Sequence, residues 1–221
     1  MNLYEEIYEQ AARKFNSTEE LASFMPVVLT KEQLESQTDA FYLSAMTRRI
    51  FQAGMRHSVI NSKWAYFEEV FWGFDPEKII YIDETFMERA MQDKGLIRHW
   101  GKLQTIPVNA LEMIDTAAEY KGFGQLLANW DQDITALWAL LSKRFKRMGG
   151  LSSSYFLRMV GIDTFILTDD VVRRLITLNI IDKKPTSKKD IQTVNNTFNE
   201  LRDVSGKPFS HLSKLLALSL E

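Results

Sequence analysis

The chain has 221 residues, of which 45% are hydrophobic and 25% are charged. This balance is typical of a folded globular protein and excludes a disordered or fibrous chain. The formal net charge of −2 provides no overall attraction for a polyanion, so any binding of nucleic acid must depend on a local cluster of basic residues. The chain has no cysteine, which excludes disulfides and thiolate chemistry.

Composition also bears on cofactors and cellular location. Three histidines without a cysteine argue against a structural zinc site, and we expect neither a metal nor a cofactor. No segment approaches the roughly 18 consecutive apolar residues of a membrane span. The N-terminal segment MNLYEEIYEQ is acidic and amphipathic, unlike a signal peptide. We therefore expect a cytoplasmic protein with no membrane partner.

Apolar residues recur at intervals of three and four over most of the chain, which predicts helices. A first helix is predicted over residues 3–15, and the pattern from Ser17 to Glu20 is a capping box that opens a second. Pro107 is expected to kink a long helix over residues 96–120. The other helices are predicted over residues 38–53 and 57–72, from starts at Asp75-Pro76 and Asp83-Glu84, from residue 133 up to Gly149, and over 187–203 and 209–219.

Strands are not predicted anywhere in the chain. Strict two-residue alternation is almost absent, and the longest β-branched cluster, at residues 162–168, is short enough to be a buried connector. No internal repeat, low-complexity segment or long linker divides the sequence. We therefore predict an all-α fold in a single domain of residues 1–221. This prediction is compatible with two lobes around a cleft within that domain.

A basic segment contains the turn between two predicted helices, at about residues 136–161. Between Ser142 and Gly161 there are five basic residues and no acid. A glycine-rich turn at the start of a helix lets backbone amides approach a phosphate. The alternatives are a solvated helix face and an ordinary junction, where glycines end one helix and Ser152 caps the next. The candidate phosphate-binding residues are Lys146, Arg147, Gly149, Gly150, Ser152 and Ser153.

Two adjacent acids, Asp169 and Asp170, follow the predicted buried connector. Thr168 or Asp169 is a suitable N-cap, so one acid has an ordinary structural explanation. A carboxylate in the first turn of a helix is held ionised, which suits a group that stabilises a developing cation rather than one that donates a proton. Capping and catalysis are compatible at this position.

Three motifs follow one another in the first half of the chain: FQAG at residues 51–54, FWGFDPEKI at 71–79 and ERAMQDKGLIRHWGKLQTIPVNA at 88–110. In this order they resemble the DNA-3-methyladenine glycosylase I family. The segment FKRMGGLSSSYFLRMVG at 145–161 resembles the helix-hairpin-helix of the same family. The regions that contain these motifs, residues 51–110 and 145–161, cover about a third of the chain. The resemblance implies a helix-hairpin-helix glycosylase fold and a monomer that acts on damaged double-stranded DNA in base excision repair.

The resemblance also assigns roles to individual residues. Asp170 takes the second-acid position of the catalytic aspartate in the wider superfamily, and Leu151 takes the position of the lysine found in members that also cleave the strand. A monofunctional glycosylase is therefore implied, acting on an alkylated purine similar to 3-methyladenine. The family has a Cys–His zinc site, an acidic residue before the QAG turn and a base-stacking Trp after it. This chain has no Cys, and has Arg49 and His57 at the latter two positions.

An extruded base needs a pocket lined by aromatic rings. The candidates for base binding are His57, Gln52, Phe41, Tyr42, Trp64 and Trp100, and the alternative for each is a structural role. Arg49 is a candidate for contact with phosphate or with Asp170. Lys102 and Arg98 are expected to form salt bridges that brace the lobes. The competing functions are a helix-hairpin-helix DNA-binding protein without catalysis and an all-α interaction protein.

Overall fold

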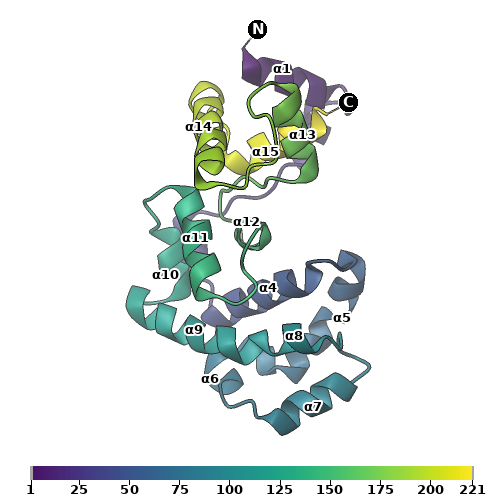
Figure 1. Ribbon diagram of the computed structural model, residues 1–221, viewed down its shortest axis with the longest axis vertical. Helices are drawn as coiled ribbons and strands as arrows, with labels where there is room; N and C mark the ends of the chain where they lie inside the picture. The colour runs from purple at the N-terminus through teal and green to yellow at the C-terminus, as the bar shows by residue number, and fades with distance from the viewer. Residues whose placement is uncertain (1, 221) are drawn as a thin grey trace. The chain divides into compact units, whose positions relative to one another are not determined.

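The computed structural model of the protein describes residues 2–220, and every regular element in that range is helical (Figure 1). The all-α prediction is therefore confirmed. The chain divides into two compact units, which correspond to the two lobes that the sequence left open. We call residues 29–160 the central unit and residues 2–28 with 161–220 the terminal unit. A single domain over residues 1–221 stays a prediction.

The central unit is organised around α4 (Asp39–Gln52), which packs against α5, α9 and α12. Its aromatic core contains Phe51 and a stack in which the Trp64 ring lies between the rings of Phe67 and Phe74. The other elements of this unit are α3 (Lys31–Glu35), α5 (His57–Val70), η1 (Trp72–Phe74), α6 (Pro76–Ile79), α7 (Glu84–Gln92), α8 (Trp100–Leu103), α9 (Thr105–Tyr120), α10 (Phe123–Ala128), α11 (Ile134–Arg144) and α12 (Ser152–Met159).

In the terminal unit, α15 contacts α1, α13 and α14. Its core contains Phe165 stacked on Phe198, with ring centroids 4.2 Å apart and an interplanar angle of 4°, and Phe209 edge-on to both rings. Phe165 belongs to the segment 162–168, which is non-helical and largely buried, as predicted for a connector. The helices of this unit are α1 (Leu3–Ala12), α2 (Thr18–Ser23), α13 (Asp169–Thr177), α14 (Lys188–Ser205) and α15 (Phe209–Leu218).

Most predicted helices form within a few residues of their expected ends, because the turn and capping residues act locally. Asp75 and Asp83 each accept a hydrogen bond from a first-turn amide of the helix that follows. At Ser17 only half of the predicted capping box is present. The Ser17 hydroxyl accepts from the Glu20 amide, but the Glu20 carboxylate accepts from Asn16 instead of Ser17.

Two predicted helix boundaries are wrong. The helix expected over residues 96–120 is two helices interrupted at Gln104, and Pro107 lies in the first turn of α9, where its missing amide hydrogen is tolerated. The helix expected to continue to Gly149 ends at Arg144, because Phe145 turns to an extended conformation and buries its ring. No helix in residues 2–220 is long and apolar enough to cross a membrane.

Candidate functional site

Helices α11 and α12 form the predicted hairpin of helices, joined by residues 145–151. Asn109 on α9 holds this turn through both main-chain groups of Lys146: its amide nitrogen donates to the Lys146 carbonyl at 3.2 Å, and its side-chain oxygen accepts from the Lys146 amide at 2.7 Å. The Ser153 hydroxyl donates to the Met148 carbonyl at 2.5 Å. These hydrogen bonds to buried groups hold the conformation of the turn, so no contact on its solvent-facing side is needed to stabilise it.

The outer face of the turn is open to an approaching strand. Gly149 and Gly150 are exposed, and Gly150 has a φ of +59° that favours glycine. A Cβ added at Gly150 would meet no atom within 4 Å. Lys146 and Arg147 are exposed beside these glycines. The turn therefore combines two exposed glycines with two exposed cations that precede them, an arrangement that can bind a phosphate group.

The two serines predicted to bind phosphate lie on the inner side of the hairpin. Ser152 is 8% exposed and is the first residue of α12, not its cap, since the N-cap position belongs to Leu151. Ser153 is 1% exposed, and its hydroxyl is already used by the Met148 carbonyl. We therefore withdraw the expectation that the Ser153 hydroxyl contacts DNA, because a buried hydroxyl with a carbonyl partner is not presented to a ligand.

Next to the hairpin, three cations gather in what we call the cationic cluster, which consists of Arg49, Lys102 and Arg147. Lys102 is 5% exposed, and its ammonium donates to the carbonyls of Phe51 at 3.0 Å and Ala53 at 2.6 Å. Arg147, which has a φ of +61°, donates from Nε to the carbonyl of Gly101 at 2.8 Å. The cluster therefore joins the QAG turn, α8 and the hairpin.

Arg49 completes the cluster from the last turn of α4. Its guanidinium carbon lies 4.2 Å from the centroid of the Tyr155 ring on α12, which is a cation–π contact. Burial lowers the pKa of Arg49. The pKa of Lys102 is also lowered, first by burial and then by the positive charges of Arg147 and Arg49. Within residues 2–220 no member of the cluster forms an ion pair with a carboxylate, so its charge is not neutralised there.

The cluster brings some predicted base-binding residues together. The two carbonyls that accept from Lys102 flank Gln52, and Trp100 begins the same short helix as Lys102. The Trp100 ring is 39% exposed, whereas Gln52 is 7% exposed and donates to Asn61 at 3.1 Å. His57 is exposed at the start of α5. Trp100 and His57 thus remain accessible to a base, while the Gln52 amide nitrogen is already in use.

The other three base-binding candidates do not belong to this site. Tyr42 is 0% exposed and its hydroxyl donates to the Leu34 carbonyl at 2.7 Å. Trp64 is 4% exposed and donates from Nε1 to Ser44 at 3.0 Å. Phe41 is exposed, but it lies eleven residues before Gln52 on α4, which places it about 16 Å away along the helix axis. We therefore retain none of the three in the proposed pocket.

Asp170 lies in the first turn of α13 in the terminal unit. The N-cap of this helix is Thr168, whose hydroxyl accepts from the Val171 amide at 3.2 Å, so neither acid is needed for capping. The Asp170 carboxylate is about half exposed, and its partner is the guanidinium of Arg173 one turn later. Asp169 is more exposed and pairs with Lys184 at 3.1 Å. Each acid therefore has one cationic partner, and neither is needed as the N-cap.

The structure offers no site that fits the zinc ion of the family that the motifs resemble. The chain has no cysteine, and its three histidines lie on three different segments, at His57, His99 and His211. No group of three or more His, Asp or Glu residues suited to a metal occurs in residues 2–220. The residues present do not fit a Cys–His zinc site, so we assign no step to a metal.

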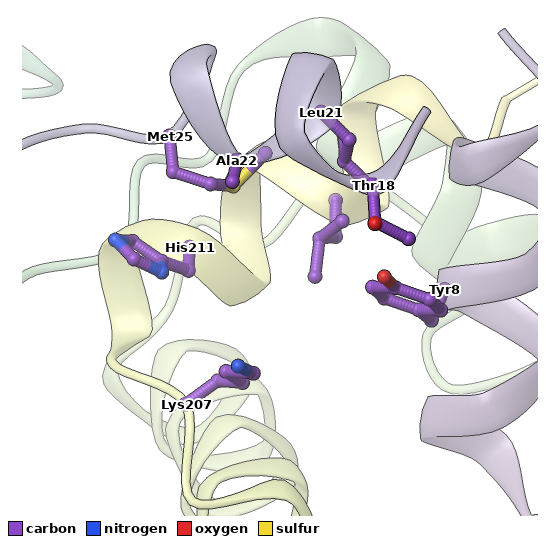
Figure 2. Close-up of a pocket in the computed structure, with 8 residues that line it drawn as sticks. Tyr8, Thr18, Leu21, Ala22, Met25, Lys207 and His211 are labelled. Carbon is purple, nitrogen blue, oxygen red and sulfur yellow. The ribbon is translucent and has the colours of Figure 1, made fainter. Parts of the chain in front are cut away.

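A pocket of about 160 Å³ lies within the terminal unit between α1, α2 and α15, as Figure 2 shows. Its polar groups come from Tyr8, Thr18, Lys207 and His211, and His211 makes a hydrogen bond of 3.0 Å with the Pro26 carbonyl. The rest of its lining is apolar and consists of Leu21, Ala22, Met25 and Leu215. No carboxylate lines this pocket, so it lacks the group that would stabilise a sugar cation.

Sequence reasoning did not single out Asn109 or Tyr155, and it expected a salt bridge at Lys102. Asn109 grips the hairpin, Tyr155 stacks on Arg49, and Lys102 binds backbone carbonyls rather than forming a salt bridge. Each contact joins segments that are at least 37 residues apart. Asn109 and Lys102 both lie in the motif at residues 88–110 that resembles the family, which indicated that this segment is important. No local sequence pattern predicted which groups they contact.

Comparison with known proteins identifies relatives of this chain. A sequence model of the methyladenine glycosylase family matches residues 34–147. DNA-3-methyladenine glycosylase 1 of Escherichia coli is 31% identical over 113 residues, which covers 44% of this chain and 60% of that protein. The chain thus matches less than two thirds of this relative's length. The family match lies in the central unit and ends before Asp170.

Two solved structures extend the likeness of the fold. The 3-methyladenine DNA glycosylase I of Staphylococcus aureus has a TM-score of 0.51 at 18% identity and covers 70% of this chain and 91% of its own. The 8-oxoguanine DNA glycosylase of Methanocaldococcus jannaschii has a TM-score of 0.61 at 14% identity and covers 97% of this chain and 91% of its own. At these identities the likeness is one of fold, and in the second case it includes both units.

Proposed function

Because the chain belongs to the methyladenine glycosylase family, we propose that it is a monofunctional DNA glycosylase of base excision repair. It hydrolyses the N-glycosidic bond of an alkylated purine similar to 3-methyladenine, after that nucleotide has been turned out of duplex DNA. The proposed partner is damaged double-stranded DNA, bound by a cytoplasmic monomer. The class of reaction rests on the family match, and the proposed chemistry rests on the half-exposed carboxylate of Asp170.

Asp170 supplies what the transition state of this reaction requires. The base departs with the electrons of the glycosidic bond, and positive charge develops on the sugar. A nearby carboxylate stabilises that charge and accepts a proton from the attacking water, whose oxygen bonds to the anomeric carbon. A purine alkylated at a ring nitrogen is already cationic, so it leaves without a strong general acid. Because Thr168 caps α13, the Asp170 carboxylate is not needed as the cap, and its partner Arg173 is an exposed side chain one turn later that can move away.

The nature of the products follows from the residue at the start of the second hairpin helix. Leu151 lies directly before α12, where an amine would be needed to attack the sugar covalently and cleave the strand. Leucine has no nucleophile, so the proposed products are the free base and an intact strand with an abasic sugar. The exposed amides and cations of the hairpin turn hold the neighbouring phosphates and help to offset the cost of extruding the base, about a few kcal/mol.

The adjacent acids provide a matched test of this proposal. Methylated duplex DNA is incubated with the wild-type protein, with Asp170→Asn and with Asp169→Asn, and free 3-methyladenine is separated and measured. We expect Asp170→Asn to lower the rate of base release by at least about 100-fold. Asp169→Asn, which removes the same charge one residue earlier, should stay within a few-fold of the wild type. Both variants should bind DNA, since neither changes the hairpin.

Three outcomes have different meanings. Equal loss in both variants would point to general electrostatics and remove the special role of Asp170. Full activity in Asp170→Asn would contradict the mechanism but leave the activity. DNA binding by the wild type without release of any base, from methylated or deaminated DNA, would favour a helix-hairpin-helix DNA-binding protein without catalysis.

A further inference from the structure

Arg49 has an unused set of hydrogen-bond donors. Its side chain is 8% exposed, and its Nε is buried without a hydrogen-bond partner. Its terminal nitrogens form neither a hydrogen bond nor an ion pair with any group in residues 2–220. The ring of Tyr155 supports one face of the guanidinium and leaves its donor edge for another partner. A guanidinium edge of this kind matches a ligand with two oxygen acceptors side by side.

The cationic cluster as a whole also lacks an anion. Burial lowers the pKa of Lys102, and the positive charges of Arg147 and Arg49 lie near enough to lower it further. Arg49 and Lys102 are both more than nine-tenths buried. Burying like charges together without a carboxylate is unfavourable, because each has lost water and gained repulsion. Such an arrangement is expected where a negatively charged ligand completes the site.

We propose that the cationic cluster is a binding site for one phosphodiester group of DNA, in addition to the amides of the hairpin turn. The guanidinium of Arg49 binds two phosphate oxygens, and Lys102, whose ammonium feels the charges of both Arg147 and Arg49, adds positive charge to the site. This inference rests on the DNA binding that the proposed function includes. It adds a second anchoring point on the central unit, next to the exposed ring of Trp100.

The charge of the cluster favours a phosphate over a nucleobase. A methylated purine of the proposed class is a cation, which three positive charges would repel. The edge of an unmodified base offers acceptors but carries no charge to balance the cluster. A phosphodiester provides both the paired oxygens and the negative charge.

The proposed site is tested by substituting Arg49, with the same substitution of the neighbouring Arg48 as the control. The logarithm of the affinity for undamaged duplex DNA is measured against the logarithm of salt concentration for the wild type, Arg49→Met and Arg48→Met. Arg48 is adjacent in sequence but already has partners, Asn61 at 3.1 Å and the ring of Trp64. We expect Arg49→Met to reduce the salt slope by about 1 and Arg48→Met to leave it unchanged. Equal slopes for wild type and Arg49→Met would overturn the proposal.

Thermal unfolding with inorganic phosphate gives a second readout that needs no DNA. A ligand that binds the folded state raises the melting temperature, so phosphate should stabilise the wild type more than Arg49→Met. Without phosphate, Arg49→Met should be at least as stable as the wild type, because it removes a buried charge without an ionic partner. A large fall in its melting temperature, with equal stabilisation by phosphate in both proteins, would assign Arg49 a structural role and overturn the proposal.

A scan with single methylphosphonate linkages distinguishes a phosphate from a base as the ligand. One neutral linkage should weaken binding of the wild type and have no further effect on Arg49→Met. If no linkage behaves in this way and Arg49→Met instead changes which lesion is released, the ligand is a base edge and the phosphate proposal is wrong. The salt titration, the thermal unfolding and the linkage scan measure binding, whereas the test of glycosylase activity measures base release. Failure of the phosphate-site proposal can therefore be distinguished from failure of the proposed function.

Discussion

Lys102 donates a hydrogen bond of 2.6 Å to the carbonyl of Ala53, at the point where α4 ends and the QAG turn begins. The same ammonium donates to Phe51 at 3.0 Å, so one buried side chain satisfies the two carbonyls on either side of Gln52. The end of a helix leaves such carbonyls without intrahelical partners. Lys102 thus fixes the QAG turn, which is one of the motifs that resemble the family.

Replacing Lys102 with methionine is expected to destabilise the protein by about 2 kcal/mol, because buried carbonyl acceptors lose their partner. Relief of the repulsion from Arg49 and Arg147 should partly offset this loss. The matched control is Lys63→Met, whose ammonium also binds backbone carbonyls, at 2.6 Å and 3.0 Å, but near the surface where water can replace it. Urea unfolding should give less than about 1 kcal/mol for the control. An equal loss in both variants would contradict the role of burial.

The two glycines of the hairpin turn should respond differently to alanine. Gly150 has a φ of +59°, so Gly150→Ala is expected to cost about 1 kcal/mol of stability through backbone strain, although no atom obstructs the new Cβ. Gly149 has ordinary backbone angles, and its Cβ would come 3.4 Å from Ser142 Oγ, so Gly149→Ala should have a smaller effect on stability. Urea unfolding measures both changes.

DNA binding tests a different property of the same two glycines. Each alanine places a methyl group on the exposed amide surface, so both variants should bind duplex DNA more weakly if phosphate approaches these amides. A Gly149→Ala variant with unchanged stability and unchanged affinity would show that the strand does not contact the turn at this position.

Arg147 is held in a left-handed conformation that disfavours any residue except glycine. Arg147→Gly should therefore be more stable than Arg147→Ala by about 1 kcal/mol, although both lose the same side chain and the bond to Gly101. Both variants should reduce the salt slope of DNA binding by about 1, because both remove the same charge. Urea unfolding and salt titrations measure the two effects, and equal stability of the two variants would show that the left-handed backbone costs nothing.

Helix positions were largely predictable from the sequence because their signals are local. The starts at Asp75 and Asp83 depend on one side chain and the first-turn amides, and periodicity identified α4 and α5. The errors arose where distant contacts decide the outcome. Phe145 leaves α11 because its ring is buried against Phe123, with ring centroids 5.7 Å apart, which no local rule predicts.

In the candidate site, too, features set by local sequence were predictable and features set by distant contacts were not. The hairpin glycines and the two acids were proposed from residue type and position next to a helix start, and the family resemblance then selected Asp170. Aromatic candidates were harder, since the sequence does not distinguish the buried ring of Trp64 from the exposed ring of Trp100. The cationic cluster could not be predicted, because Arg49, Lys102 and Arg147 are far apart in the chain and meet only in the folded unit.

The pKa of Tyr42 leads to a prediction at high pH. Burial, with a smaller contribution from the charge of Asp39, raises this pKa from 10.0 to about 12. Between these values the unfolded chain releases the Tyr42 proton while the folded protein keeps it. The free energy of unfolding must therefore fall as pH rises from 10 toward 12. The contribution of this single group is at most about 2 to 3 kcal/mol.

Tyr42→Phe isolates this effect from the other tyrosines. Below pH 10 the variant should be less stable than the wild type by about 1 kcal/mol, because the bond from the Tyr42 hydroxyl to the Leu34 carbonyl is lost. As pH rises, the wild type loses stability through Tyr42 and the variant does not, so the difference should shrink and then reverse. Urea unfolding at pH values on both sides of 10 measures this. A difference independent of pH would mean that water reaches the Tyr42 hydroxyl in the folded protein.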